Sequence, residues 1–489
     1  MTPKYDKNTP RYTFAIMLRS MGYTLETSIA DIIDNSIEAQ ATEIHVDWKH
    51  DGEGKNVDDP RSFVCISDNG TSMTKDRLKE AFEYGAEREE KSYLDQLGSF
   101  GTGMKAASTA WCKRLTVAAR QDSNSKRIYG RRMDLDVMKE EGDWVTESLN
   151  KNDLRDEILE HIKDKPGTAV LWENLDLLLN NSDPFSDDAK DDIAKAFEDV
   201  EKYLGMVFHR FLDGKCVINK DRKKVKIFIN GRAIKSFDPC WHDRHEKLKI
   251  HKTPGAMREL FSESKGEMVP VKMQGWCLPT EAEFIKIGLT ADDYKKMASP
   301  GKGLNFSQGC YFYRADRIIK YGGWTDGVKM EEHKKNARMT IDFDSRLDTN
   351  FKVDIAKGKA KVPNDLNKFM NDLSMNVRAA ADKRYRNKKI SVSTKPKTGT
   401  TTGTTTGTTT GTGTGTGTTT GTGTGTGTTT GTGTTTGTGT GTTTGTGNEI
   451  DGPSAIKELE DVVRDLGVLT EMKENLRKRS ARAAEYFGW

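Results

Sequence analysis

The strongest constraint on what this chain can fold into is an uninterrupted tract of threonine and glycine. Residues 398–447 contain no other residue type. Such a tract has no large apolar side chain, so it cannot bury enough surface to offset the entropy of ordering it. We therefore expect a disordered linker, with a mean span of about 40 Å for a flexible coil of this length.

The charge of the chain is almost balanced, with 76 Lys and Arg against 73 Asp and Glu and a net charge of +3. This balance excludes a globally basic nucleic-acid coat but allows a local basic face. No apolar run approaches the roughly 20 residues that a membrane helix needs, and the N-terminus has no apolar signal core. We therefore expect no membrane association and a cytoplasmic protein, or a nuclear one if the source is eukaryotic.

Apolar periodicity before the tract predicts helices mixed with strands. Residues 14–39 have helical spacing, and a further helix begins near Gly103. Strands are expected at residues 44–48, 63–66, 115–117 and 169–172, and later at 225–229 and 309–313. Asn230-Gly231 is a strong turn signal. This order predicts an α+β fold whose first part is a two-layer sandwich.

The same features predict five parts of the chain. The boundaries are a first domain at 1–185, a second α/β domain at 190–375, a basic helix at 376–397, the linker at 398–447 and an amphipathic C-terminal helix at 448–489.

Two segments place carboxylates where they could meet a ligand. Asp31 and Asn35 are four residues apart and share one face of the expected helix, where a carboxylate could orient water and an amide oxygen could bind a hard cation. Asp68 ends a strand, and Gly70 behind it would let the backbone approach a ligand. The alternatives are an exposed polar helix face and an ordinary strand-ending turn.

Two further segments are weaker when taken alone. The sequence GSFGTGMKAAS, at residues 98–108, places Gly101, Gly103 and Lys105 at a helix start, where backbone amides could surround a phosphate. It is neither a Walker A loop nor a Rossmann glycine pattern. Thr168 opens a later strand and could support the carboxylate of Asp68.

Taken in this order, the four segments resemble the motifs of the GHKL ATPases, which include gyrase B, the heat-shock-ninety chaperones, histidine kinases and MutL. The segments are ADIIDNSIEAQAT, SDNGTSM, GSFGTGMKAAS and GTAVLWENL, between about residues 10 and 180. The resemblance implies a Bergerat ATP-binding fold with a mixed sheet on one face and helices on the other. It also implies ATP and Mg²⁺ as ligands and residues 71–97 as the ATP lid.

By resemblance, each matched residue receives a role. Asp31 would be the general base and Asn35 the Mg²⁺ ligand, while Asp68 would accept the adenine amine. The remaining nucleotide contacts would be Gly70, Met73, Gly101, Gly103, Lys105 and Thr168.

Two positions depart from the family pattern. Asp31 stands where gyrase, MutL and MORC-like members have Glu, and it is one methylene shorter, so the attacked water would have to lie closer. Ser72 stands where the adenine box usually has its second glycine, which would stiffen the hinge of the lid.

The second domain resembles the transducer of MORC- and MutL-like proteins and their prokaryotic relatives. The residues are YLGMVFHRF at 203–211, YFYR at 311–314 and RII at 317–319. The segment FKVDIAKGKAKV, at 351–362, resembles the MutL segment whose lysine reaches the γ-phosphate. In register that lysine is Lys359, with Lys357 as its substitute, and a solvated basic loop is the alternative.

The resemblance implies an Mg²⁺-dependent ATPase that dimerises when it binds ATP and acts as a clamp, with DNA as its client. Basic segments at 220–226 and 383–389 favour DNA. The alternative is a chaperone-like or scaffold ATPase that binds a protein through the C-terminal helix. A histidine kinase is disfavoured because no phosphoacceptor His lies ahead of the ATP site. A zinc site at Cys240, His242, His245 and His251 is disfavoured because it lacks a second ligand pair.

Overall fold

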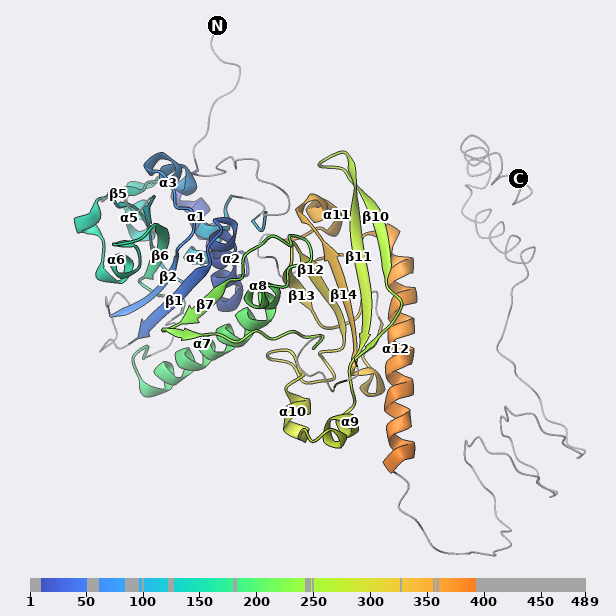
Figure 1. Ribbon diagram of the computed structural model, residues 1–489. Helices are drawn as coiled ribbons and strands as arrows, with labels where there is room; N and C mark the ends of the chain where they lie inside the picture. The colour runs from blue at the N-terminus through green and yellow to red at the C-terminus, as the bar shows by residue number, and fades with distance from the viewer. Residues whose placement is uncertain are drawn as a thin grey trace, which may run out of the picture. The chain divides into compact units, whose positions relative to one another are not determined.

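We describe the fold from a computed structural model (Figure 1). It describes residues 10–50, 61–83, 96–98, 101–121, 127–178, 183–241, 248, 250–325, 328–354, 357 and 360–392. The expected linker at 398–447 and the C-terminal helix at 448–489 lie outside these residues.

The first sheet has eight strands in the order β5-β4-β3-β6-β2-β1-β7-β8. Their neighbours pair antiparallel except for β1 and β7, which are parallel. The strands are β1 (Glu43–His50), β2 (Ser62–Asp68), β3 (Arg114–Arg120), β4 (Tyr129–Asp134), β5 (Glu147–Leu149), β6 (Gly167–Glu173), β7 (Lys226–Ile229) and β8 (Arg232–Ala233).

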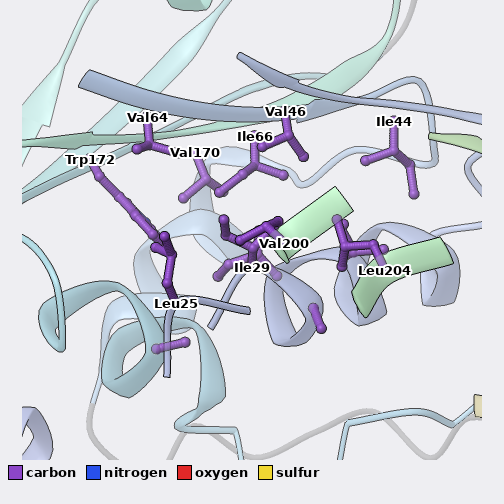
Figure 2. Packing of buried hydrophobic residues seen from close by; sticks show 14 of the residues in the cluster. Leu25, Ile29, Ile44, Val46, Val64, Ile66, Val170, Trp172, Val200 and Leu204 are labelled. Atoms are coloured by element: carbon purple, nitrogen blue, oxygen red, sulfur yellow. The ribbon is translucent and has the colours of Figure 1, made fainter. Parts of the chain in front are cut away.

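Helices cover one face of this sheet and enclose the main core. They are α1 (Tyr12–Arg19), α2 (Leu25–Glu38), α4 (Gly103–Thr109), α5 (Leu135–Glu141) and α7 (Asp187–Val207). Figure 2 shows Leu25 and Ile29 of α2 beneath the apolar side chains of the strands, with Val200 and Leu204 of α7 beside them. The α+β class expected from the sequence is therefore confirmed.

The opposite face of the first sheet is covered by α6 (Asp156–Ile162), which adds a layer to the expected sandwich. Successive residues of a strand point to opposite faces. In β2, Val64 and Ile66 accordingly join the main core, whereas Phe63 and Cys65 pack with Ile158 under α6. This is why every residue of β2 is buried. Helix α3 (Lys75–Phe82) lies beside β3 and β4.

The helical spacing over residues 14–39 corresponds to two helices, α1 and α2, with a break between them. Gly22 has a φ of +77°, which a glycine adopts without steric cost. Thr24 then caps α2 by accepting a hydrogen bond from the Thr27 amide at 3.3 Å. Apolar spacing alone did not reveal this turn.

The second sheet has six strands, in the order β10-β11-β14-β12-β13 with β9 paired to β11. Strands β12 and β14 are parallel, and the other pairs are antiparallel. The bounds are β9 (His251–Lys252), β10 (Ala256–Ser262), β11 (Glu267–Cys277), β12 (Gly309–Arg314), β13 (Arg317–Tyr321) and β14 (Ala337–Phe343). Helix α12 (Asn364–Val392) runs alongside the sheet (Figure 1). Its residues Leu366, Met370 and Leu373 belong to the same hydrophobic core as the strands.

Shorter helices complete the described chain. They are α8 (His209–Asp213), α9 (Glu281–Lys286), α10 (Ala291–Lys295) and α11 (Asp348–Phe351), with 3₁₀ turns at Lys151–Asp153, Glu332–Lys334 and Ser345–Leu347. Among the described residues, no helix is long and apolar enough to cross a bilayer.

Two boundaries differ from those expected. The predicted strand at 225–229 is β7, but it joins the first sheet through β1 rather than the second domain. The turn at Asn230-Gly231 connects it to β8, and both turn residues have positive φ, as a tight hairpin of this hand requires. The basic helix begins at Asn364 and is continuous across the expected boundary at 375, because its first turns bury apolar side chains on the second sheet.

Candidate active site

Helix α2 carries the candidate catalytic carboxylate. Its apolar residues Ile29, Ile33 and Ile37 are fully buried in the main core. This packing fixes the rotation of the helix, so Asp31 is turned away from the sheet and is only 4% exposed. Its Oδ2 accepts a hydrogen bond from the Tyr23 hydroxyl at 3.0 Å.

Gly103, the first residue of α4, lies directly against Asp31. A Cβ at this position would collide with the carboxylate of Asp31, so only glycine allows the third motif to pack this closely on the first. The two motifs therefore meet at the start of α4.

Two cations from beyond residue 310 reach the carboxylates of α2. Lys357 Nζ donates to Asp31 Oδ1 and, at 2.6 Å, to Asp34 Oδ2. Arg317 of β13 places its Nε 3.1 Å from Asp34 Oδ1. All four side chains are buried. Buried ions need such partners, because burying an unpaired charge costs roughly several kcal/mol in lost hydration.

The two carboxylates differ in their ionisation. Burial disfavours the charged form of Asp31, but Lys357 and Arg317 outweigh it and lower the pKa of this carboxyl below its usual value. At Asp34 burial outweighs the same cations, and the charge of Asp31 adds to it, so the pKa of Asp34 is raised. Asp31 is thus the group held as a carboxylate.

Asp68, the candidate adenine acceptor, ends β2. Its Oδ1 accepts from the Gly70 amide at 2.9 Å, and its Oδ2 accepts from the Ser36 hydroxyl of α2 at 2.8 Å. Thr168 is its antiparallel partner on β6. Burial raises the pKa of Asp68, and the hydrogen bonds from Gly70, Ser36 and the Thr168 backbone oppose that rise.

Glycines allow the backbone to close tightly around Asp68. A Cβ on Gly70 would lie 2.6 Å from the carbonyl oxygen of Ala39, so no larger residue fits there without a shift. Ser72, which replaces the family's glycine, donates to the Gly167 carbonyl at 2.7 Å. This bond ties the segment after β2 to the start of β6. Met73 is half-buried and packs against the main core.

The candidate phosphate segment has its lysine directed into the protein. Gly101 has a φ of +65°, and Lys105 is only 1% exposed. Lys105 Nζ donates to the carbonyls of Ala81, at 2.8 Å, and Gly101, at 3.1 Å. Burial lowers the pKa of Lys105 to about 8. In this arrangement Lys105 links α4 to α3, so the expected phosphate contact would require its ammonium to move.

Asn35 and the two candidate lysines complete the predicted set. Asn35 is half-buried one turn beyond Asp31, and its side chain makes no hydrogen bond to another described residue, which leaves its amide oxygen available to a cation. Lys359 lies outside the described residues. Its named substitute, Lys357, is the lysine that the structure brings to Asp31.

A further contact joins the second sheet to the expected lid. Arg314 of β12 donates to the carbonyl of Leu97 at 2.5 Å and to that of Gln96 at 3.2 Å. Its other nitrogens hold Asp348 at 2.5 and 2.6 Å. Of the predicted lid, residues 84–95 lie outside the described residues.

Sequence reasoning did not assign roles to several residues of this site. They are Tyr23, Asp34, Ser36, Arg314 and Arg317. Ser36 lies inside the first motif, and both arginines lie in segments noted for their resemblance to transducers. Nothing in their local spacing indicates that they would meet residues more than 200 positions away.

A family comparison matches the part of the chain that holds this geometry. Residues 23–168 match the family described as histidine kinase-, DNA gyrase B- and HSP90-like ATPases. Among solved structures, the chain resembles one titled as the N-terminal domain of a DNA repair protein, with 13% identity, a TM-score of 0.38, and coverage of 77% of this chain and 98% of that one. No curated protein matches.

The matched range contains α2, the end of β2, the start of α4 and the first residues of β6, which are the elements that meet around Asp31 and Asp68. Residues 23–168, the part of the chain that holds Asp31 and Asp68, therefore match the GHKL ATPase family.

Proposed function

We propose that this protein is an Mg²⁺-dependent ATPase in which nucleotide binding changes the position of the second sheet and drives two chains to form a clamp on DNA. The observation that carries the proposal is the contact of Lys357 with Asp31 and Asp34. It links the candidate general base to a segment that follows the second sheet.

The roles of the ATP-site residues follow from their surroundings. Asp68 is a buried acceptor at a strand end, suited to an exocyclic amine. Asn35 offers a hard oxygen ligand for Mg²⁺, which would screen phosphate charge when bound. Asp31 is held as a carboxylate, the form that a general base requires.

Lys357 gives the proposal its switch. In the arrangement described here, both oxygens of Asp31 are occupied, one by Lys357 and one by Tyr23. Asp31 accepts a proton from water more readily once Lys357 leaves it, because the pKa of Asp31 then rises. A triphosphate attracts an ammonium through charge. Movement of Lys357 from Asp31 toward the phosphates would therefore activate the base and shift the second sheet together.

The test measures ATP binding and hydrolysis in the wild type, Asp31→Asn and Asp68→Asn, with Asp192→Asn as a matched exposed control. We expect Asp31→Asn to bind ATP without turnover, Asp68→Asn to fail to bind, and Asp192→Asn to match the wild type. A sizing column with a nonhydrolysable analogue then tests dimerisation. A wild type that neither binds nor hydrolyses ATP would overturn the proposal.

The DNA client is supported by a run of exposed lysines beside β7. Lys220, Lys223 and Lys224 are exposed in the described structure. If they contact phosphates, the double variant Lys223→Gln/Lys224→Gln should weaken DNA binding at every sequence and reduce the slope of log affinity against log salt by about 2. An unchanged slope would reject this surface.

A scaffold ATPase whose client is a protein remains the alternative. It is favoured by the arginines of α12, because they are already paired with carboxylates. Arg378 is 2.6 Å from Glu331, and Arg384 is 2.9 Å from Glu283. Deletion of residues 448–489 distinguishes the DNA clamp from the protein scaffold. If the full-length chain does not bind DNA and the deletion abolishes binding of a protein partner, the scaffold is favoured.

A further inference from the structure

Three potential metal ligands meet on the face of the first sheet that lies opposite the candidate active site. His45 and Asp47 are two residues apart on β1 and so point to the same face. The alternate residues of β1, Ile44 and Val46, point into the main core. His45 and Asp47 therefore lie on the opposite face, which α6 covers. His161 lies in the last turn of α6 and faces them.

The three side chains are close enough to share one ion. His161 Nε2 lies 2.9 Å from Asp47 Oδ2, and the rings of His45 and His161 have centroids 5.3 Å apart. One ligand atom from each residue falls within 4.8 Å of the other two. Tetrahedral coordination at about 2.0–2.2 Å requires separations of about 3.4 Å. Small side-chain rotations would bring the most distant pair to that spacing.

The side chains are positioned but retain freedom to adjust. All three residues are half-buried. The ring of His45 stacks on Phe228 of β7, with centroids 4.7 Å apart and the planes within 9° of parallel, which fixes the plane of one candidate ligand.

The carboxylate of Asp47 has an unmet requirement. Its Oδ2 is shielded from solvent yet accepts no well-aligned hydrogen bond from the described residues, although His161 Nε2 is near. A buried acceptor without a donor costs about 1–3 kcal/mol, so such atoms usually have a partner. A cation between Asp47 and the two imidazoles would meet this requirement.

We propose that His45, Asp47 and His161 bind one divalent transition-metal ion of the Zn²⁺ class. Two imidazoles and one carboxylate suit Zn²⁺ and its neighbours, whereas Mg²⁺ and Ca²⁺ prefer oxygen ligands. The ligands come from β1 and α6, so the ion would join α6 to the sheet and stabilise the layer on this face.

The test uses the full-length, untagged chain stripped with a chelator and titrated with Zn²⁺ by calorimetry, with Co²⁺ absorption as a second probe. We expect one ion per chain, visible Co²⁺ bands typical of low coordination number, and a higher Tm with Zn²⁺. These readouts need no nucleotide, so they stand independently of the proposed ATPase activity.

Substitutions identify the ligands. His161→Gln and Asp47→Asn should each weaken Zn²⁺ binding more than about 10-fold, because loss even of an outer partner costs about 10- to 100-fold. The exposed control His333→Gln should bind as the wild type does, and so should Cys240→Ser. The proposal is overturned if the wild type binds no ion, if both ligand variants bind normally, or if only Cys240→Ser loses binding.

Discussion

At the residue scale, Lys357 balances two buried carboxylates at once. It contacts both Asp31 and Asp34, and Arg317 adds a second positive charge beside Asp34. Removing one charged side chain from this buried cluster should destabilise the fold, because the remaining charge is still desolvated but has lost its partner. The same residue is thus important for the fold and for the proposed switch.

The substitution Lys357→Gln should lower the free energy of unfolding by about 3–5 kcal/mol, the usual cost of breaking a buried ion pair. It should also reduce kcat more than about 10-fold while ATP still binds. Lys357→Arg retains the charge and should recover part of both losses. Urea denaturation and steady-state kinetics measure the two effects, and an unchanged stability would contradict the buried pair.

Lys105 gives a pH prediction. Its pKa is lowered to about 8 in the folded protein, against an ordinary value of 10.5, so the unfolded chain holds the proton more tightly. Between pH 8 and 10.5 the unfolded state therefore binds more protons, and the contribution of Lys105 to stability rises with pH. Below pH 8 both states are protonated and the contribution is constant.

The measurement is denaturant unfolding of the wild type and Lys105→Met at pH 7, 8, 9 and 10. The stability of the wild type relative to the variant should be flat from pH 7 to 8 and then increase. A difference that is the same at all four values would mean that Lys105 keeps an ordinary pKa.

At the element scale, α2 connects the parts of the site. Through Asp31 it lies against Gly103, and through Ser36 it holds Asp68, which in turn pairs with Thr168 on β6. Its start is fixed by the cap at Thr24, next to Tyr23, whose hydroxyl holds Asp31. A loss of order at this end should therefore disturb Asp31, the candidate catalytic carboxylate.

Thr24→Ala should cost about 1 kcal/mol, because the first turn of α2 loses its side-chain acceptor. Thr24→Ser keeps the acceptor and should remain within a few tenths of a kcal/mol of the wild type. Thermal unfolding gives the stabilities, and kcat reports whether Asp31 is disturbed. Equal stability of the alanine and serine variants would show that the cap has no effect.

At the scale of the whole described unit, residues of the second sheet contact both the carboxylates of α2 and the end of the expected lid. Arg317 meets Asp34, while Arg314 meets the carbonyls of Gln96 and Leu97. These two strands are adjacent in the sheet. A displacement of β12 and β13 would therefore act on the lid and on α2 together.

Arg314→Gln should separate nucleotide binding from its consequence. We expect ATP affinity to stay within a few-fold of the wild type, while analogue-driven dimerisation on a sizing column falls more than about 10-fold. The control Arg346→Gln removes the ion pairs to Asp344 and Glu267 beside the same sheet. Equal dimerisation by the two variants would count against coupling through Arg314.

Local sequence patterns predict the parts of this protein that depend on neighbouring residues. Apolar patterns predict the strands β1, β2, β3, β6 and β12, and Asn230-Gly231 predicts the hairpin turn between β7 and β8. The motifs predict Asp31, Asp68 and Thr168 as residues of one site. These predictions rest on side-chain spacing and backbone preference, which are properties of short segments.

The contacts between residues far apart in the sequence depend on the tertiary structure. Lys105, which was expected at the phosphates, instead donates hydrogen bonds to the carbonyls of Ala81 and Gly101. Lys357 is the lysine that contacts Asp31. Strand β7, which was expected in the second domain, pairs with β1 in the first sheet. Such contacts depend on how sheets and helices pack to bury their apolar faces and to pair buried charges, and a short window of sequence does not contain that information.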